Sequence, residues 1–418
     1  MTICYQVTRF VMDSGERYCL LKEQATCLPL YYPNLYLLTQ LRNRSVAFAT
    51  IEAEAAHLAV FHRYLIRRGI NLDERISTGM LLRDFELEDL YHFTQRKALK
   101  VSTDVLDNSL FMLEELEEST DPVGSSTHYA RLTATANYIQ WLARHLLENP
   151  PKDYAEQISS ICNQIKERRP SRKNRNRNGL GKSLTDEQID LLFEVMRPGA
   201  ELNPFTVSVQ KRNRLIVLLL FHLGIRGGEL LNLRIRDIDF SANQLKVVRR
   251  ADETGDARTR EPNTKTLGRV LPLGDVLAKE LHDYIVNERR KVPHAKSNDY
   301  LIITHKEGPT QGAPISKAAY YKVIAVVRSV SPQLYEMSGH MFRHTWNRKF
   351  SEKMDEMDSP MSPERQEQVR SFLMGWKEGS NTASLYNRRF AEQKAHEAAL
   401  DMQKTSGVRV PRGLADEK

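Results

Sequence analysis

The sequence predicts a mainly α-helical protein with a small antiparallel sheet, divided into two domains. Apolar residues recur at helical spacing over most of the 418 residues. A basic segment without any period, residues 166–183, interrupts that pattern. Two later segments, 244–250 and 269–273, have the composition of strands and are joined by a polar loop too long for a tight turn, and 301–304 is a candidate third strand. The sheet therefore belongs to the second domain.

Helices are predicted on both sides of the basic segment. The first 44 residues have no clear period, so their structure and role stay open. Helices expected before the basic segment cover 51–69, 87–93, 110–116 and 127–147. After it, a capping box at Thr185–Gln188 opens a helix over 189–195, and an apolar helix over 213–223 stops at Gly224. Further helices are expected over 276–290, 317–329, 340–354, 364–373 and 384–402. The predicted division is an extension (1–44), a helical domain (45–165), a linker (166–183), a second domain (184–403) and a tail (404–418).

The charge balance and the cysteines indicate the kind of partner and the compartment. The chain has 61 Lys and Arg against 53 Asp and Glu, a net charge of +8 that favours a polyanionic partner, either nucleic acid or an acidic membrane. No apolar run approaches the roughly 20 residues of a membrane span. The four cysteines form no C-x-x-C pair and are too few for a disulfide scaffold. We expect a cytoplasmic protein without a membrane partner.

The linker is the most basic stretch of the chain. Eight of the residues in KERRPSRKNRNRNGLGKS are Lys or Arg, and Pro, Asn and Gly break any period. It could be a solvated connector or a strap along a phosphate backbone. Because so little acidic charge compensates it, the second interpretation is favoured, with DNA contacts expected from Arg172, Lys173, Arg175 and Arg177.

The segment SGHMFRHTW contains two histidines, His340 and His344, at the spacing that places two imidazoles on one helix face, as in zinc sites. The glutamate of the zinc-protease pattern is replaced by Met341, and Arg343 between the histidines would repel a divalent cation. Two histidines satisfied by hydrogen bonds are therefore favoured over a metal site. An anion such as a phosphate oxygen would suit Arg343 and His340, and no metal is predicted.

Two other segments contain candidate site residues. In HLGIRGGELLNL, Arg226 follows the helix end at Gly224, and it could simply pair with Glu229 three residues on. In LMGWKEGSNTASLYNRR, Trp376 follows a helix end and Tyr386 lies on the next predicted helix, where most tyrosines are core residues. Neither segment decides a function by itself.

Taken in order, these segments resemble the tyrosine recombinases, also called the phage integrase family. The resemblance consists of G-I-R-x-G-E-L-L-x-L, then H-x-x-R-H, then L-x-G-W with a tyrosine ten residues later. TKTLGRVLPL resembles the family's β-hairpin segment, which carries a catalytic lysine, and the helical half resembles its core DNA-binding, SAM-like domain. The resemblance covers residues 45–400 and implies an α+β catalytic domain after the linker.

The resemblance implies a transesterification on double-stranded DNA that needs no metal, ATP or other cofactor. Tyr386 would attack the scissile phosphate and form a 3′-phosphotyrosyl link. Arg226 and Arg343 would clamp the non-bridging oxygens as charge develops. His340 would assist proton transfer from the tyrosine, and Lys265 would protonate the departing 5′-oxygen.

The remaining residues of the motifs would support these groups. The resemblance implies that Trp376 acts through its indole N–H and its packing, and that Glu229 and His344 orient the catalytic side chains. The role of the lysine could also fall to another cation near the hairpin: Lys246, Arg258 or Arg260.

Three functions remain open at this point: a recombinase, a type IB topoisomerase-like enzyme, and an inactive DNA-binding accessory or regulatory protein of the same fold. A small apolar stripe at i, i+4, i+7 and i+11 follows Tyr386, formed by Ala391, Ala395, Ala398 and Met402. It could pack on its own domain or dock into a neighbouring protomer, as the family's C-terminal helix does. Docking favours a recombinase that works as a tetramer, with accessory recombination proteins as further partners.

Overall fold

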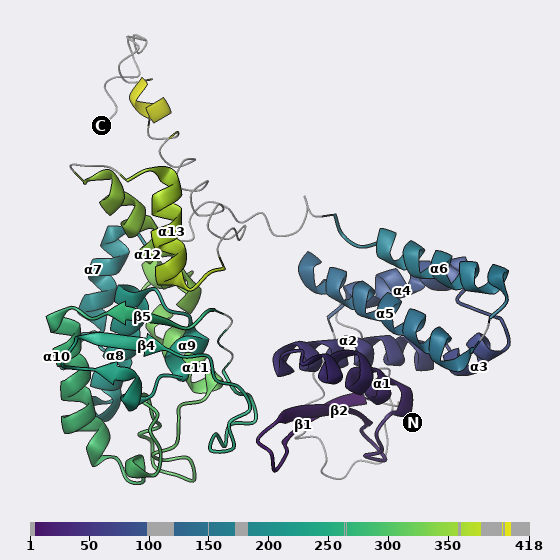
Figure 1. The fold of residues 1–418 in the computed structure, drawn as a ribbon, viewed down its shortest axis with the longest axis horizontal. Helices are drawn as coiled ribbons and strands as arrows, with labels where there is room; N and C mark the ends of the chain where they lie inside the picture. Colours follow the sequence, from purple (N-terminus) through teal and green to yellow (C-terminus); the bar gives the residue numbers. More distant parts are fainter. Residues whose placement is uncertain are drawn as a thin grey trace. The chain divides into compact units, whose positions relative to one another are not determined.

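The computed structural model of the chain describes residues 5–97, 121–148, 150–171, 183–262, 264, 266–357, 361–377, 395 and 398–402. Its contacts divide the chain into two compact units, Met1–Arg177 (unit 1) and Asn178–Lys418 (unit 2) (Figure 1). The middle of the predicted linker lies outside the described residues. The boundaries of the predicted domains therefore stay a prediction, and each unit is described by itself.

Unit 1 consists of a β-hairpin and a set of helices. The strands β1 (Tyr5–Val11) and β2 (Arg17–Glu23) pair antiparallel, with Tyr5 opposite Glu23 and Val11 opposite Arg17. A short helix, a π turn and a 3₁₀ turn lead into the longer helices. In chain order the bounds are α1 (Tyr31–Tyr36), η1 (Leu37–Leu41), η2 (Arg42–Arg44), α2 (Phe48–Arg67), α3 (Leu72–Ser77), α4 (Asp84–Gln95), α5 (Ser125–Leu146) and α6 (Lys152–Glu167).

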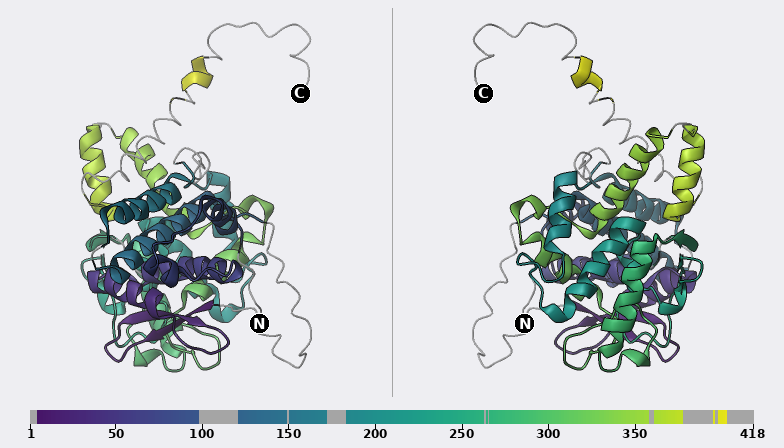
Figure 2. Two further views of the ribbon diagram at one scale, coloured as in Figure 1. Left: turned by 90° about the vertical axis from the view of Figure 1, so that its right-hand side faces the viewer. Right: turned by 90° about the vertical axis from the view of Figure 1, so that its left-hand side faces the viewer.

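Helix α2 lies at the centre of unit 1, between the hairpin and α5 (Figures 1 and 2). Apolar residues at helical spacing give α2 its buried side, which includes Ile51, Leu58 and Phe61. Tyr138 of α5 packs its ring 6.2 Å from that of Phe61 and is fully buried. Residues 5–44, for which the sequence suggested no structure, thus belong to the packed core of unit 1 through the hairpin and α1.

Unit 2 places a three-stranded antiparallel sheet among helices. The strand order is β3 (Ile238–Asp239), β4 (Gln244–Val247) and β5 (Arg269–Pro272), with Leu245 opposite Leu271. The helices and turns are α7 (Asp186–Val195), α8 (Val207–Leu223), α9 (Gly227–Leu231), η5 (Ile235–Asp237), α10 (Asp275–Asp283), η6 (Tyr284–Glu288), η7 (Arg289–Lys291), η8 (Ala295–Ser297), α11 (Lys317–Arg328), η9 (Pro332–Leu334), α12 (Gly339–Asp355) and α13 (Pro363–Met374).

Helix α8 forms the core of unit 2. The whole run Leu215–Leu220 is buried, because α12, α10 and α9 contact the helix from different sides. A helix that is apolar all round is stable only when it is enclosed in this way. At its end Gly224 adopts a left-handed conformation (φ +58°), which ends the helix and directs the chain to Arg226.

The fold class predicted from the sequence is confirmed: the protein is mainly helical with a small antiparallel sheet. Two expectations about its elements were wrong. The third strand is Ile238–Asp239 and not 301–304, where Ile303 forms only an isolated bridge with Pro314. The helix expected over 276–290 leaves the α form at Asp283 and continues as π and 3₁₀ turns.

The expected helices over 110–116 and most of 384–402 lie outside the described residues. Of the helices that the structure does describe, none has the length and apolar character needed to cross a membrane.

Candidate active site

Arg226 is placed where α8 passes into α9. It is the residue before the first turn of α9, and its backbone N–H donates to Glu229 Oε2 at 3.2 Å, which caps that helix. The side chain is 27% exposed, and its Nη1 lies 3.6 Å from Glu229 Oε1, without a hydrogen bond to any described residue. The ion pair with Glu229 that the sequence suggested is therefore loose, and the guanidinium remains partly accessible to solvent.

Glu229 has closer partners than Arg226. Its side chain is fully buried, and it accepts from Arg269 Nη2 at 2.8 Å and from Thr266 Oγ1 at 2.5 Å. Burial alone would raise the pKa of Glu229, but the charge and hydrogen bond of Arg269 and the Thr266 hydroxyl outweigh it and hold the pKa below its ordinary value. The carboxylate thus stays charged and connects α9 to the start of β5.

Arg343, on α12, is fixed from two helix ends. It is 1% exposed, and its Nη1 donates to the Gly224 carbonyl at 2.9 Å while its Nη2 donates to the Met374 carbonyl at 2.7 Å. Carbonyls at helix C-termini carry the negative end of the helix dipole, so they suit a cation. The contacts therefore orient the Arg343 guanidinium at the point where α8 and α13 end.

Trp376 lies against the guanidinium of Arg343. It follows Gly375, the left-handed residue that ends α13, and is 7% exposed in a small cluster with Met374 and Trp346. Its ring lies 5.2 Å from Arg343 Cζ, within the range of a cation–π contact. Arg226, Glu229, Arg343 and Trp376 are thus brought together by contacts that the structure describes.

His340 and His344 lie on one face of α12, as their spacing predicts. Their ring centroids are 4.7 Å apart and the rings are nearly perpendicular, so one imidazole edge meets the face of the other. His340 is exposed in the first turn of α12, and His344 is partly buried. Across the described part of the chain, no group of three or more His, Cys, Asp or Glu side chains is arranged to hold a metal ion.

The other predicted site residues lie outside the described residues. They are Tyr386, Lys265 and the linker residues Arg172, Lys173, Arg175 and Arg177. The two described neighbours of the lysine, Thr264 and Thr266, are both buried, and Thr266 contacts Glu229. The segment that carries Lys265 is therefore attached to the cluster around Glu229.

Arg258, one of the alternatives to that lysine, has a different environment. Its guanidinium is buried, pairs with Asp256 at 2.8 Å and donates to the carbonyls of Leu231 and Ile315 at 3.0 and 3.1 Å. It also stacks over the Tyr300 ring at 4.7 Å. These contacts favour a structural role, in which Arg258 anchors the long loop between β4 and β5.

Sequence reasoning missed Arg269 and Thr266, which hold Glu229. A signal for Arg269 was present, because it lies two residues before Leu271 in a strand and so shares its inward face. A cation on an inward face needs a buried carboxylate. Thr266 gave no such signal, since a buried hydroxyl in a loop can bond to many partners.

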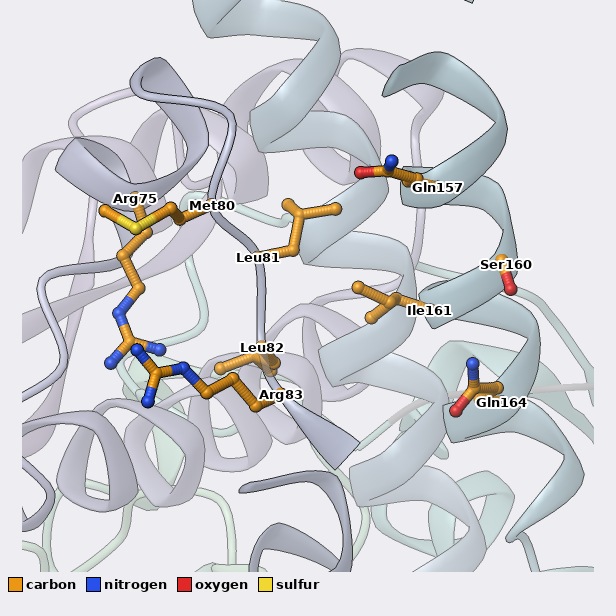
Figure 3. A pocket seen from close by; sticks show the side chains of 9 residues that line it. All are labelled: Arg75, Met80, Leu81, Leu82, Arg83, Gln157, Ser160, Ile161 and Gln164. Atoms are coloured by element: carbon orange, nitrogen blue, oxygen red, sulfur yellow. The ribbon is translucent and has the colours of Figure 1, made fainter. Parts of the chain in front are cut away.

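Unit 1 contains a separate groove of about 540 Å³ (Figure 3). Arg75, Met80 and Arg83 line one side, and Gln157 and Gln164 of α6 line the other. The charge of Arg75 is matched by Glu86 at 2.8 Å. The lining offers no nucleophile with a neighbouring base, so the candidate active site is the cluster in unit 2.

The cluster in unit 2 has an excess of positive charge. Three guanidinium groups, those of Arg226, Arg269 and Arg343, lie around one carboxylate, that of Glu229, so cations outnumber carboxylates among these four side chains. Guanidinium groups favour the oxygens of phosphate and carboxylate ligands. The arrangement is suited to an anion that approaches the exposed edge of Arg226.

Comparison with known proteins agrees with this chemistry. The sequence profile described as the phage integrase family matches residues 182–392, half of the chain. The chain belongs to the phage integrase family, the tyrosine recombinases. Its match covers unit 2 from the end of the linker through the position of Tyr386.

Two curated relatives have informative names. The tyrosine recombinase XerD of Halalkalibacterium halodurans is 23% identical over 167 residues, which cover 40% of this chain and 47% of that protein. Transposase A from transposon Tn554 of Staphylococcus aureus is 31% identical over 140 residues, 32% of this chain and 35% of that protein. The chain thus spans less than half the length of these relatives.

A solved structure resembles a larger part of the chain. The XerH site-specific recombinase, in a pre-cleavage complex with its difH substrate, matches with a TM-score of 0.50 at 17% identity, over 84% of this chain and 80% of that one. At this identity the likeness concerns the fold, and it extends over both units.

Proposed function

We propose that this protein is a site-specific DNA recombinase that cuts and rejoins strands through a 3′-phosphotyrosyl intermediate. The observation that supports it best is the cluster of Arg226, Arg343 and Trp376 around the buried Glu229, in a chain whose family match runs through Tyr386. A phosphodiester carries the negative charge that this excess of cations would attract. XerD, XerH and the Tn554 transposase, by their names, act in recombination or transposition.

In the proposed reaction the Tyr386 oxygen bonds to the scissile phosphorus, and the bond from phosphorus to the 5′-oxygen breaks. The tyrosine proton passes toward His340, and Lys265 gives a proton to the 5′-oxygen. The guanidinium groups of Arg226 and Arg343 stabilise the extra charge on the non-bridging oxygens in the transition state. Rejoining reverses these steps with a 5′-hydroxyl from another strand, so no metal or nucleotide cofactor is required.

The remaining site residues would act on these groups. Trp376 packs against Arg343 and keeps water from it, and Glu229 and His344 hold the groups beside them. The contacts of Glu229 give the clearest support for such a role, because this side chain connects Arg226 to the segment before β5.

We also propose that the protein works as a tetramer on double-stranded DNA. The described residues at the end of the helix predicted over 384–402 are exposed, with Leu400 at 44% and Met402 at 70%, as expected of a segment that docks elsewhere. The basic linker, with Arg172, Lys173, Arg175 and Arg177, would lie along the phosphate backbone of the DNA. Accessory recombination proteins could then arrange the paired sites, and the reaction would take place in the cytoplasm.

The covalent intermediate provides the test. The protein would be incubated with sheared genomic DNA of its source organism, and DNA that stays attached under denaturing conditions would be sequenced. A nicked duplex built on the captured sequence would then trap the adduct, because the cut strand loses the 5′-hydroxyl needed for rejoining. We expect the adduct to form equally in excess chelator, since the proposed chemistry uses no metal.

Two variants decide which tyrosine reacts. Tyr386→Phe should form no adduct while binding the duplex as well as the wild type, because only the attacking oxygen is lost. Tyr335→Phe removes the hydroxyl of an exposed tyrosine (69%) elsewhere in unit 2 and should react normally. An adduct in Tyr386→Phe, or DNA binding without any adduct in the wild type, would reject the recombinase and favour an inactive DNA-binding protein.

Products separate the recombinase from a topoisomerase. A recombinase joins strands from two different duplexes, whereas a type IB topoisomerase only relaxes supercoils in one. Mixing two duplexes of different length that carry the captured site should yield strands of hybrid length. Relaxation of plasmid without hybrid strands would support the topoisomerase.

A further inference from the structure

Tyr320, on α11, lies beside the start of both helices that carry the candidate site. It is 4% exposed. A methyl group added to Gly339 would lie 2.0 Å from the Tyr320 hydroxyl oxygen, and one added to Gly227 would lie 2.9 Å from the Tyr320 ring and 3.0 Å from that oxygen. Only glycine leaves room for the phenol at these two positions.

The two glycines place the hydroxyl next to the predicted site residues. Gly227 directly follows Arg226, and Gly339 directly precedes His340. Gly339 is also the first residue of α12, a helix of 17 residues whose N-cap, Ser338, makes no side-chain hydrogen bond to the first turn. The Tyr320 hydroxyl therefore lies at the N-terminal turn of α12, where backbone N–H groups favour an anion.

The Tyr320 hydroxyl makes no hydrogen bond to any residue that the structure describes. The ring is buried, while the hydroxyl is left without a partner among the described residues, so it can donate to a bound ligand. Burial raises the pKa of Tyr320, which keeps the phenol neutral and able to donate its proton. A phenylalanine would fill the same space without leaving a polar atom between two glycines.

We propose that the Tyr320 hydroxyl donates a hydrogen bond to a non-bridging oxygen of the DNA phosphate that binds at the start of α12. The inference rests on the proposed function, since it takes the scissile phosphate as the anion. A phosphodiester oxygen accepts hydrogen bonds and donates none, so it complements a neutral phenol, the N–H groups of α12 and the guanidinium of Arg226. Tyr320 would be a further residue that touches the reacting group.

The test compares two neighbouring tyrosines of the same helix. Tyr320→Phe removes only the hydroxyl, and Tyr321→Phe makes the same change in a side chain that is 66% exposed. In single-turnover reactions on the nicked duplex, we expect Tyr320→Phe to form the adduct about 100- to 1,000-fold more slowly, the range for losing one donor to developing charge. Tyr321→Phe should react at the wild-type rate, and the thermal unfolding midpoints of all three proteins should agree.

Methylphosphonate duplexes distinguish a phosphate contact from a packing role. Each diastereomer replaces one non-bridging oxygen of the scissile phosphate by a methyl group. Tyr320→Phe should slow the reaction of one diastereomer as it slows the normal duplex, but it should have no effect on the diastereomer that lacks the contacted oxygen. An equal effect of the substitution on every duplex, or no effect on any, would overturn the inference while leaving the recombinase intact.

A second readout applies if the wild type forms no adduct at all, which would reject the proposed function. Inorganic phosphate should then raise the thermal midpoint of the wild type and of Tyr321→Phe more than that of Tyr320→Phe, because only the last lacks the donor. Equal midpoint shifts in the three proteins would reject the Tyr320 contact as well.

Discussion

Two buried ionisable groups, one in each unit, show two different ways of placing such a group in a protein core. In unit 1, His62 packs among the rings of Tyr5, Phe61 and Tyr138, and burial lowers its pKa to about 4, so the ring is neutral at physiological pH. In unit 2, Glu229 is buried as a charged carboxylate that pairs with Arg269. His62 thus meets the cost of burial by staying neutral, whereas Glu229 meets it by pairing its charge.

The difference follows the position of the candidate site. Burying an ion pair removes two charges from water, and apolar residues of similar volume would often be as stable or more so. A protein can retain a buried ion pair in spite of this desolvation if the charged groups orient other residues. Glu229 caps the helix that begins after Arg226, and Arg269 also donates to the Leu373 carbonyl at 2.7 Å, close to the end of α13. We infer that the Glu229–Arg269 pair is buried in unit 2, in spite of its desolvation, because it orients Arg226 and the end of α13.

Removing one partner of the buried pair in unit 2 should have the largest effect on stability. Arg269→Met should destabilise unit 2 by about 3–5 kcal/mol at pH 7, because it leaves Glu229 buried without its cation. It should also slow adduct formation, since Arg226 loses its support. Urea unfolding monitored by the hydrogen exchange of peptides from α9 and β5 measures the loss in the free energy of unfolding.

A matched variant shows whether burial causes the effect. Arg214→Met breaks a partly exposed pair with Glu280 at 3.4 Å in the same unit, and it should change stability by no more than about 1 kcal/mol. The effect of Arg269→Met should also depend on pH. Glu229 has a lowered pKa in the folded protein, so its contribution is complete above about pH 4.3 and is lost as the pH falls through the folded value. An Arg269→Met penalty as small as that of Arg214→Met would show that the pair does not support the site.

Unit 1 should respond to acid at a higher pH than the pair in unit 2. His62 has a pKa of about 4 when folded and about 6.5 when unfolded, so its contribution is complete above about pH 6.5 and is lost as the pH falls toward 4. The loss for one such ring is at most about 3 kcal/mol. Hydrogen exchange of peptides from α2 and α5, compared between variants at each pH, measures it.

Replacing the imidazole isolates its contribution. His62→Phe keeps a ring against Tyr138 and should protect α2 at pH 5 more than the wild type is protected. His92→Phe makes the same change at a side chain that is 59% exposed, and α2 should then respond to acid as in the wild type. If His62→Phe were as acid-sensitive as the wild type, the contrast between the units would not lie in their buried groups.

Much of the fold could be predicted from the sequence, because helices leave a strong periodic signal. The capping box Thr185–Gln188 and the glycine stop at Gly224 appear in the structure as expected. The third strand was assigned wrongly because Ile238–Asp239 has only two residues, too few to show an alternating pattern. The hairpin of residues 5–23 was missed because neither strand alternates clearly between buried and exposed positions. Strand β1 is partly buried on both faces, and β2 has three consecutive buried residues at its start.

The candidate site was less predictable than the fold. Motif spacing was enough to select Arg226 and Arg343. In the structure, Arg343 donates to the carbonyl of Gly224, and Arg226 lies two residues after that glycine and beside Glu229. The pairing of Arg269 with Glu229 could not be predicted in this way. It depends on how strand β5 lies against helix α9, and no local sequence pattern determines that. Tyr320 is hidden for the same reason, since its closeness to Gly227 and Gly339 joins three separate elements.

Substitutions at the end of α8, which holds Arg343, should have only a small effect on stability. Gly224 has φ +58°, and a methyl group there would lie 2.8 Å from Trp346 Cγ, whereas Gly199 has φ +78° with no atom within 4 Å of an added methyl group. Both Gly→Ala changes incur the backbone cost of about 1 kcal/mol, and only Gly224→Ala adds a steric clash, so it should be the less stable of the two by about 1–2 kcal/mol in urea unfolding.

The same two variants separate stability from orientation. The clash in Gly224→Ala displaces the carbonyl that accepts from Arg343 Nη1, so adduct formation should slow in this variant even under conditions where it is fully folded. Gly199→Ala should react at the wild-type rate under those conditions. Equal rates in both variants would mean that Arg343 does not need this helix end, and that its other contacts, such as those with Met374 and Trp376, are enough to orient it.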